Sequence, residues 1–147
     1  MHANAEVACR AGELVRKKYH CSEAVVLAVG ERELGTISPE IIKITSAFGG
    51  GLAGTRQELC GALSAGAIVI GLLYGRSQLG QDETLSRYLI ALYRERFLAE
   101  FGGTLCEPLR AQYVKPDGTG NCAALVERAT RILLQVLEEG KTVQTQS

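Results

Sequence analysis

The stretch from Phe48 to Gly66, FGGGLAGTRQELCGALSAG, constrains the fold of this chain more than any other part of it. It holds six glycines and one cysteine between two apolar runs. Glycine permits positive φ angles and a close approach of two backbones. We therefore predict that the chain leaves one helix here and returns, tightly packed, as the next. Such a loop would deliver Cys60 to a crowded position at the N-terminal end of a helix.

A phosphate-binding role for this loop is the alternative. The letters GGGLAG at 49–54 match the dinucleotide pattern G-x-G-x-x-G, which requires a strand before it and a helix directly after it. The preceding residues, 39–48, have a helical pattern instead, and no Lys-Ser or Lys-Thr pair follows as in a P-loop. We interpret the small residues as structural support for the cysteine; they are Gly49, Gly50, Gly51, Gly61 and Ala62.

The rest of the chain has the periodicity of helices. No segment shows sustained alternation of apolar and polar residues, which is the pattern of a strand. The sequence predicts an all-α, single-domain bundle of about six helices over residues 1–147, with a glycine-rich loop between two of them. We expect Gly140 to end the last helix and the polar residues after it to fray. The predicted segments are 4–18, 22–34, 39–48, 58–74, 82–101, a short turn at 104–110, and a last helix from Asn121.

Composition excludes several classes of partner. Sixteen basic residues balance sixteen acidic ones without a basic block, which argues against nucleic acid and against an anionic membrane surface. The longest apolar run, 59–74, is shorter than the roughly 20 residues of a membrane span, so we predict a core helix. The N-terminal residues do not resemble a signal peptide, and we expect a cytoplasmic protein. We also predict a homodimer formed through 59–74 and 82–101.

Four of the five cysteines fall at the start of a predicted helix: Cys21, Cys60, Cys106 and Cys122. Helix N-termini present free N–H groups and the positive end of the helix dipole, and both favour the thiolate. We therefore expect the pKa of these thiols to be lowered. Cys9 differs because it lies mid-helix among apolar residues, and we predict that it is part of the core.

Three kinds of chemistry fit four such thiols. They could hold an iron–sulfur cluster or another metal such as zinc. They could instead cycle between dithiol and disulfide without metal, or they could be inert core residues of a structural or interaction module. The cysteines are separated by 38, 45 and 15 residues and form no C-x-x-C motif, so their spacing favours none of the three.

Several motifs together resemble a known family. In order they are Cys21-Ser22-Glu23-Ala24-Val25, Phe48-Gly49-Gly50-Gly51, Cys60-Gly61-Ala62, Cys106 and Cys122. This order resembles the C-GCAxxG-C-C family of redox-active proteins, over residues 19–138. The resemblance implies a four-cysteine site, made of the cysteines named above, that binds an iron–sulfur cluster or other metal for electron transfer or redox sensing. Ala65 stands where the family motif has its last glycine, and its methyl group is expected to narrow a cofactor pocket.

Overall fold

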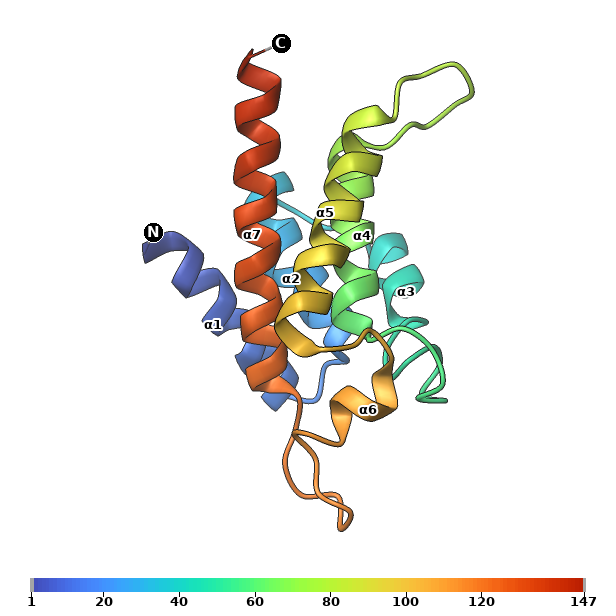
Figure 1. The fold of residues 1–147 in the computed structure, drawn as a ribbon, viewed down its shortest axis with the longest axis vertical. Helices are drawn as coiled ribbons and strands as arrows, with labels where there is room; N and C mark the ends of the chain where they lie inside the picture. The colour runs from blue at the N-terminus through green and yellow to red at the C-terminus, as the bar shows by residue number, and fades with distance from the viewer. Residues whose placement is uncertain (1, 147) are drawn as a thin grey trace.

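The computed structural model describes residues 2–146, and within them the chain forms seven helices and no extended strand (Figure 1). The predicted all-α class is confirmed. Two isolated β-bridges, Leu59 with Leu105 and Val114 with Gly120, join loops to each other. The helices are α1 (His2–Arg16), α2 (Cys21–Leu34), α3 (Pro39–Ser46), α4 (Gly61–Tyr74), α5 (Thr84–Phe101), α6 (Cys106–Arg110) and α7 (Ala123–Gln146).

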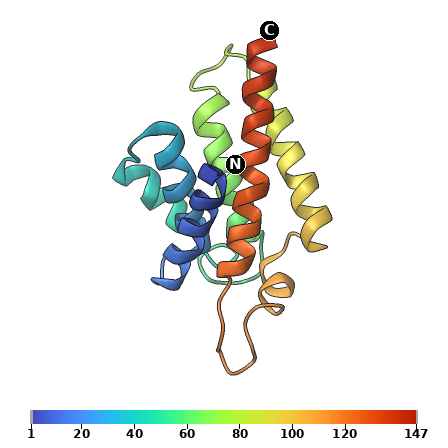
Figure 2. The same ribbon diagram turned by 90° about the vertical axis from the view of Figure 1, so that its left-hand side faces the viewer.

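The longest helix, α7, is the axis of the bundle and packs against α1, α2, α4 and α5 (Figures 1 and 2). The helix α4 is in turn packed between α2 and α5, and α3 lies outside α2. Apolar side chains from six helices, all but α3, fill the centre. Those with the largest volumes among the fully buried ones are Tyr93, Phe97, Ile70, Leu89 and Leu125.

Polar side chains at the helix starts explain where several elements begin. The Oγ atom of Ser38 accepts a hydrogen bond from the N–H of Ile41 at 3.4 Å, and Pro39 occupies the first helical position, as the sequence predicted. The Oδ1 atom of Asn121 accepts from the N–H of Ala123 at 2.9 Å. These bonds satisfy N–H groups that have no partner within their own helix.

Gly140 does not end the last helix, and this prediction is wrong. The helix α7 continues to Gln146. A side chain at 140 would come within 2.7 Å of Leu89 and 3.6 Å of Tyr74, so the glycine allows α7 to lie close to α4 and α5. The residue is buried for a packing reason, and its backbone remains helical.

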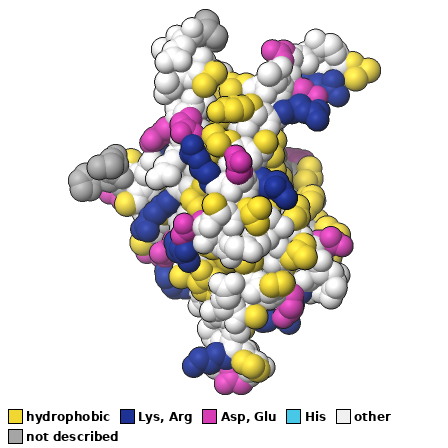
Figure 3. All heavy atoms as spheres, in the orientation of Figure 1, with side chains coloured by type: hydrophobic (Ala, Val, Ile, Leu, Met, Phe, Trp, Pro, Cys, Tyr) yellow, Lys and Arg dark blue, Asp and Glu magenta, His cyan; other side chains and the backbone are white. Residues whose placement is uncertain are grey.

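The surface carries both signs of charge in close alternation. On the face in Figure 3, Lys and Arg side chains lie beside Asp and Glu rather than in a separate basic region. Several form ion pairs, for example Arg96 with Glu139 at 2.8 Å. None of the helices described here is both long enough and apolar enough to cross a membrane.

Candidate redox site

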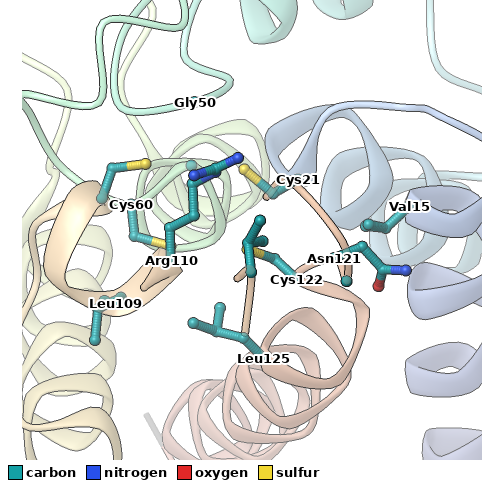
Figure 4. A pocket seen from close by; sticks show the side chains of 14 residues that line it. Val15, Cys21, Gly50, Cys60, Leu109, Arg110, Asn121, Cys122 and Leu125 are labelled. Atoms are coloured by element: carbon teal, nitrogen blue, oxygen red, sulfur yellow. The ribbon is translucent and has the colours of Figure 1, made fainter. Parts of the chain in front are cut away.

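Four segments far apart in the sequence bring Cys21, Cys60, Cys106 and Cys122 to the wall of one cavity of about 250 Å³ (Figure 4). Cys21 and Cys106 are the first residues of α2 and α6, whereas Cys60 and Cys122 directly precede α4 and α7. All five cysteines of the chain are free thiols. The remaining side chains of the wall include Val15, Leu109, Arg110, Val114, Asn121 and Leu125.

The fifth cysteine lies elsewhere, and its predicted place in the core is wrong. Cys9 is exposed on α1, and its Sγ lies 3.8 Å from Oε1 of Glu13, one turn further on. The buried face of α1 is formed by Ala8, Ala11 and Leu14 instead. Cys9 follows Ala8 directly, and adjacent residues on a helix point in directions about 100° apart.

Glycines make room for the cysteines and for the residue before Cys21. A methyl group at Gly61 would overlap Sγ of Cys21, and one at Gly51 would lie 2.5 Å from Cβ of Cys106. A methyl group at Gly49 would lie 2.6 Å from Cβ of His20. Real Cβ atoms do not approach other atoms so closely, so these positions require glycine for a steric reason.

The loop between α3 and α4 also adopts a backbone that glycine favours. Gly50 and Gly51 have φ angles of +61° and +65°, in the left-handed region. The chain folds back on itself there, because the N–H of Arg56 donates to the carbonyl of Gly50 at 2.8 Å. Gly50 lines the cavity itself. The loop therefore brings backbone, rather than side chains, against the thiols.

A short ladder joins two of the cysteine segments. The N–H of Cys60 donates to the carbonyl of Thr104 at 2.8 Å, and the N–H of Cys106 donates to the carbonyl of Glu58 at 2.8 Å. These bonds flank the bridge between Leu59 and Leu105. The sequence analysis missed this pairing, since 45 residues separate the two cysteines and neither segment has the pattern of a strand.

The first turn of α4 surrounds Cys60. Backbone N–H groups of Ala62 and Leu63 interact with its sulfur. The carbonyl of Ala62 accepts a hydrogen bond from the hydroxyl of Tyr93 at 2.9 Å. The ring of Tyr93 is fully buried and occupies the space left by Gly66, where a methyl group would overlap it. Ala62 and Gly66 therefore allow the N-terminal half of α4 to pack closely against Tyr93 of α5.

Burial, and not the position at a helix N-terminus, has the largest effect on the pKa of three of the cavity thiols. Burial raises the pKa of Cys60 to about 12, with a further contribution from the nearby Cys21, although the N–H groups of α4 act in the opposite direction. Burial followed by the proximity of Cys21 and Cys106 raises the pKa of Cys122 to about 11. Burial, followed by the proximity of Cys21 and Glu107, raises the pKa of Cys106. The predicted lowering of the pKa is wrong for these three thiols, because removing a thiolate from water costs more free energy than its interactions with the N–H groups provide.

The same electrostatic couplings show which thiols lie close together. Cys21 interacts with each of the other three, and Cys106 interacts with Cys60 and Cys122 as well. Within residues 2–146, however, no three His, Cys, Asp or Glu side chains are grouped closely enough to hold a single metal ion. The thiols thus share one cavity but are spaced more widely than a mononuclear site requires.

Arg110 is a site residue that sequence reasoning missed. Its side chain points into the cavity among the cysteines (Figure 4). It is the one charged residue of the wall within the described chain, and it partly offsets the rise in the pKa of Cys106 and Cys122. The signal that could have found it is its spacing: Arg110 follows Cys106 by four residues, which places both on one face of a helix.

Two residues close to the cysteines in sequence do not line the cavity. The side chain of His20 is 60% exposed, and the His20 backbone N–H donates to Oε1 of Glu23 at 2.9 Å, so the residue caps α2. Ala65 is fully buried but is not part of the cavity wall. The expectation that its methyl group narrows the pocket is therefore not met, because Gly61 is the residue of α4 in the cavity wall and Ala65 lies one turn further along the helix.

The order of the cysteines and the cavity that they share agree with a comparison with known families. The family described as putative redox-active protein (C_GCAxxG_C_C) matches residues 19–136. The chain belongs to this family. The match begins just before Cys21, ends within α7, and so includes the four cavity cysteines but not Cys9. No curated protein and no solved structure is significantly similar to the chain.

Proposed function

We propose that the four cavity cysteines form a redox centre that binds an iron–sulfur cluster for electron transfer or redox sensing. The observation that supports this function is that Cys21, Cys60, Cys106 and Cys122 all line one cavity of about 250 Å³. Four cysteine thiolates are the usual ligands of [2Fe–2S] and [4Fe–4S] clusters, and such a cluster, when bound, supplies a one-electron couple.

The spacing of the thiols favours a cluster over a single ion. Tetrahedral zinc with Zn–S bonds of about 2.3 Å brings its four sulfurs within about 4 Å of one another. The described residues contain no group of three ligands that meets such a condition. A cluster of several iron and sulfide atoms holds its ligands further apart and fits a larger cavity. A single zinc ion would require the thiols to move toward each other.

The electrostatics of the cavity also favour a cationic occupant. Each thiol disfavours ionisation of its neighbours, as the couplings among Cys21, Cys60 and Cys106 show. Iron or another metal cation reverses this balance, because a coordinating thiol is deprotonated outright. The N–H groups of Ala62 and Leu63 and the guanidinium of Arg110 then stabilise the thiolates. Binding should release protons in proportion to the number of thiols that ligate.

Metal and sulfide analysis of protein purified without oxygen tests this proposal. We expect stoichiometric iron and sulfide with a broad visible absorption. Replacement of Cys21, Cys60, Cys106 or Cys122 by serine should remove most of the iron. Cys9→Ser is the matched control and should keep it, because Cys9 is an exposed thiol outside the cavity. Absence of iron, or equal loss in the Cys9 variant, would contradict cluster binding.

A metal-free dithiol is the second candidate, and the position of Cys21 favours it. Cys21 is partly exposed and lies close to each of the other three thiols. Two thiols would join as a disulfide, with the loss of two protons and of two electrons to an acceptor such as another disulfide. A free-thiol count that drops by two after oxidation, with Cys21 in the mapped disulfide, is the expected result. Thiols that react only after unfolding would indicate an inert core.

The homodimer and the cytoplasmic location stay predictions. The large hydrophobic side chains of α4 and α5 that remain exposed are Leu72, Tyr88 and Leu98. Leu59, two residues before the start of α4, is exposed as well. They are the residues through which a second copy would pack. The mass of the protein in solution at micromolar concentration checks the dimer, and a monomer would contradict it.

A further inference from the structure

A second cavity, of about 530 Å³, adjoins the cysteine cavity on the side of α6. The two share Arg110, Val114 and Gly118 in their walls. The wall of this outer cavity comes from three segments: the glycine loop, α6, and the turn that follows α6. Its other residues are Arg56, Glu107, Ala111, Lys115, Pro116 and Asp117.

Three cations converge on the outer cavity from these three segments: Arg56, Arg110 and Lys115. None of them forms an ion pair with a carboxylate of the described chain. Elsewhere in the molecule such pairs are common, as between Arg128 and Glu100. Cations that converge without a protein partner leave their charge available to a ligand.

Two carboxylates face the same cavity, and one of them is already engaged. Oδ1 of Asp117 accepts hydrogen bonds from the N–H and the hydroxyl of Thr119, at 2.9 and 2.7 Å. Glu107 is the other, and it lies close enough to Cys106 to raise the pKa of that thiol. Three cations against two carboxylates leave one net positive charge in the cavity wall, beside the thiols.

The backbone holds Arg56 in place over α6. Arg56 has a φ of +64°, which is uncommon for a residue with a side chain. Its N–H donates to the carbonyl of Gly50, and its own carbonyl accepts from the N–H of Glu107 at 3.2 Å. The surrounding hydrogen bonds therefore impose a backbone conformation that would otherwise be unfavourable. The result is that Arg56 and Arg110 line the same cavity from opposite segments.

We propose that the outer cavity binds a small oxyanion through Arg56, Arg110 and Lys115. Guanidinium groups bind oxyanions through two parallel hydrogen bonds, which suits a phosphate-like or carboxylate ligand. Three cations around a pocket of about 530 Å³ suit a small ligand, and the chain as a whole carries no net charge that would attract a large acidic partner. This binding does not rest on the proposed function.

Inorganic phosphate, added to the reduced metal-free protein at constant ionic strength, is the probe. We expect saturable binding by calorimetry.

Variants locate the site. Arg110→Gln and Lys115→Gln should each weaken the binding of phosphate severalfold. Lys115 is exposed on the turn after α6, so its replacement tests the site even if the Arg110 variant folds poorly. Lys43→Gln, an exposed lysine on α3, is the matched control and should bind as the parent does.

Two results would overturn the proposal: no saturable binding of phosphate, or full binding in Lys115→Gln. The first of these would leave the cations as a surface for a larger acidic partner. Iron and sulfide content is measured independently of these titrations. Failure of cluster binding and failure of anion binding are therefore distinguishable.

Discussion

The glycines that touch the cysteine segments and two glycines at the opposite end of the bundle serve different purposes. At the cysteine end, Gly51 and Gly61 lie where a side chain would collide with Cys106 or Cys21. At the opposite end, a methyl group at Gly71 or Gly80 would meet no atom within 4 Å. The loop of Gly80 extends away from the bundle (Figure 1), and its Leu79 is 87% exposed.

This difference separates glycines that serve a site from glycines that serve a turn. The glycines at the cysteine end allow four chain segments to approach one cavity. Gly80 has a φ of +89° and needs no neighbour to explain it, because a turn alone requires that conformation. Sequence shows both kinds as the same letter, and only the contacts distinguish them.

Gly61→Ala should have the largest effect. Its methyl group would overlap Sγ of Cys21 and lie 3.1 Å from the carbonyl oxygen of Phe48. Overpacking of this kind costs about 1–3 kcal/mol, and we expect the upper part of that range because one of the obstructing groups is backbone. Urea unfolding measures the loss of stability. Cys21 should also become more reactive toward alkylating reagents, since it has to move.

The matched control for this substitution is Gly71→Ala on the same helix. If the two variants unfold at the same urea concentration, the glycines of the two ends are equivalent, and the comparison drawn above is wrong. A variant that is destabilised without any change at Cys21 would show that the collision is relieved elsewhere.

The pH dependence of stability should report the buried thiols of the cysteine end. The folded-state pKa of Cys60, about 12, lies above the ordinary value of 9.0. Its contribution to stability is therefore fully present below pH 9, and it is lost as the pH rises from 9 toward 12, where the unfolded chain ionises first. For the reduced metal-free protein the loss at pH 10 is about 1 kcal/mol.

Cys60→Ser should remove this part of the slope, whereas Cys9→Ser should leave it unchanged. Tyr93, whose pKa is raised by burial, contributes a slope of the same sign in the parent and in both variants. The quantity to measure is the free energy of unfolding at several pH values between 8 and 10.5. Identical slopes in the parent and in Cys60→Ser would argue that Cys60 is ionised or solvated in the folded protein.

Gly71→Ala should have the smallest effect and the opposite sign. Gly71 lies inside α4, and its missing side chain faces open space. Alanine is favoured over glycine within a helix by about 0.5–1 kcal/mol, because glycine loses more backbone entropy on folding. The midpoint of thermal unfolding should therefore rise slightly. A fall would show that the opposite end is packed more tightly than the contacts indicate.

Local chemistry made much of this molecule predictable. Helical periodicity predicted the all-α class, and Ser38-Pro39 predicted the start of α3, because both depend on residues within a few positions of one another. The same reasoning placed four cysteines at helix starts, which the structure bears out within one residue of each helix. The prediction that Cys9 lies within a helix, unlike the other four cysteines, is confirmed. The prediction that Cys9 is buried is wrong.

Tertiary structure alone decided what surrounds the thiols. By itself the sequence determined that the chain is helical, where its helices begin and which cysteines stand at those beginnings. It could not show that Cys60 pairs with the segment of Cys106, that Arg110 points among the thiols, or that Gly140 continues a helix. It also predicted the wrong direction for the thiol pKa. The physical reason is that capping and periodicity act over one turn of helix, whereas burial and proximity depend on residues brought together from separate segments of the chain.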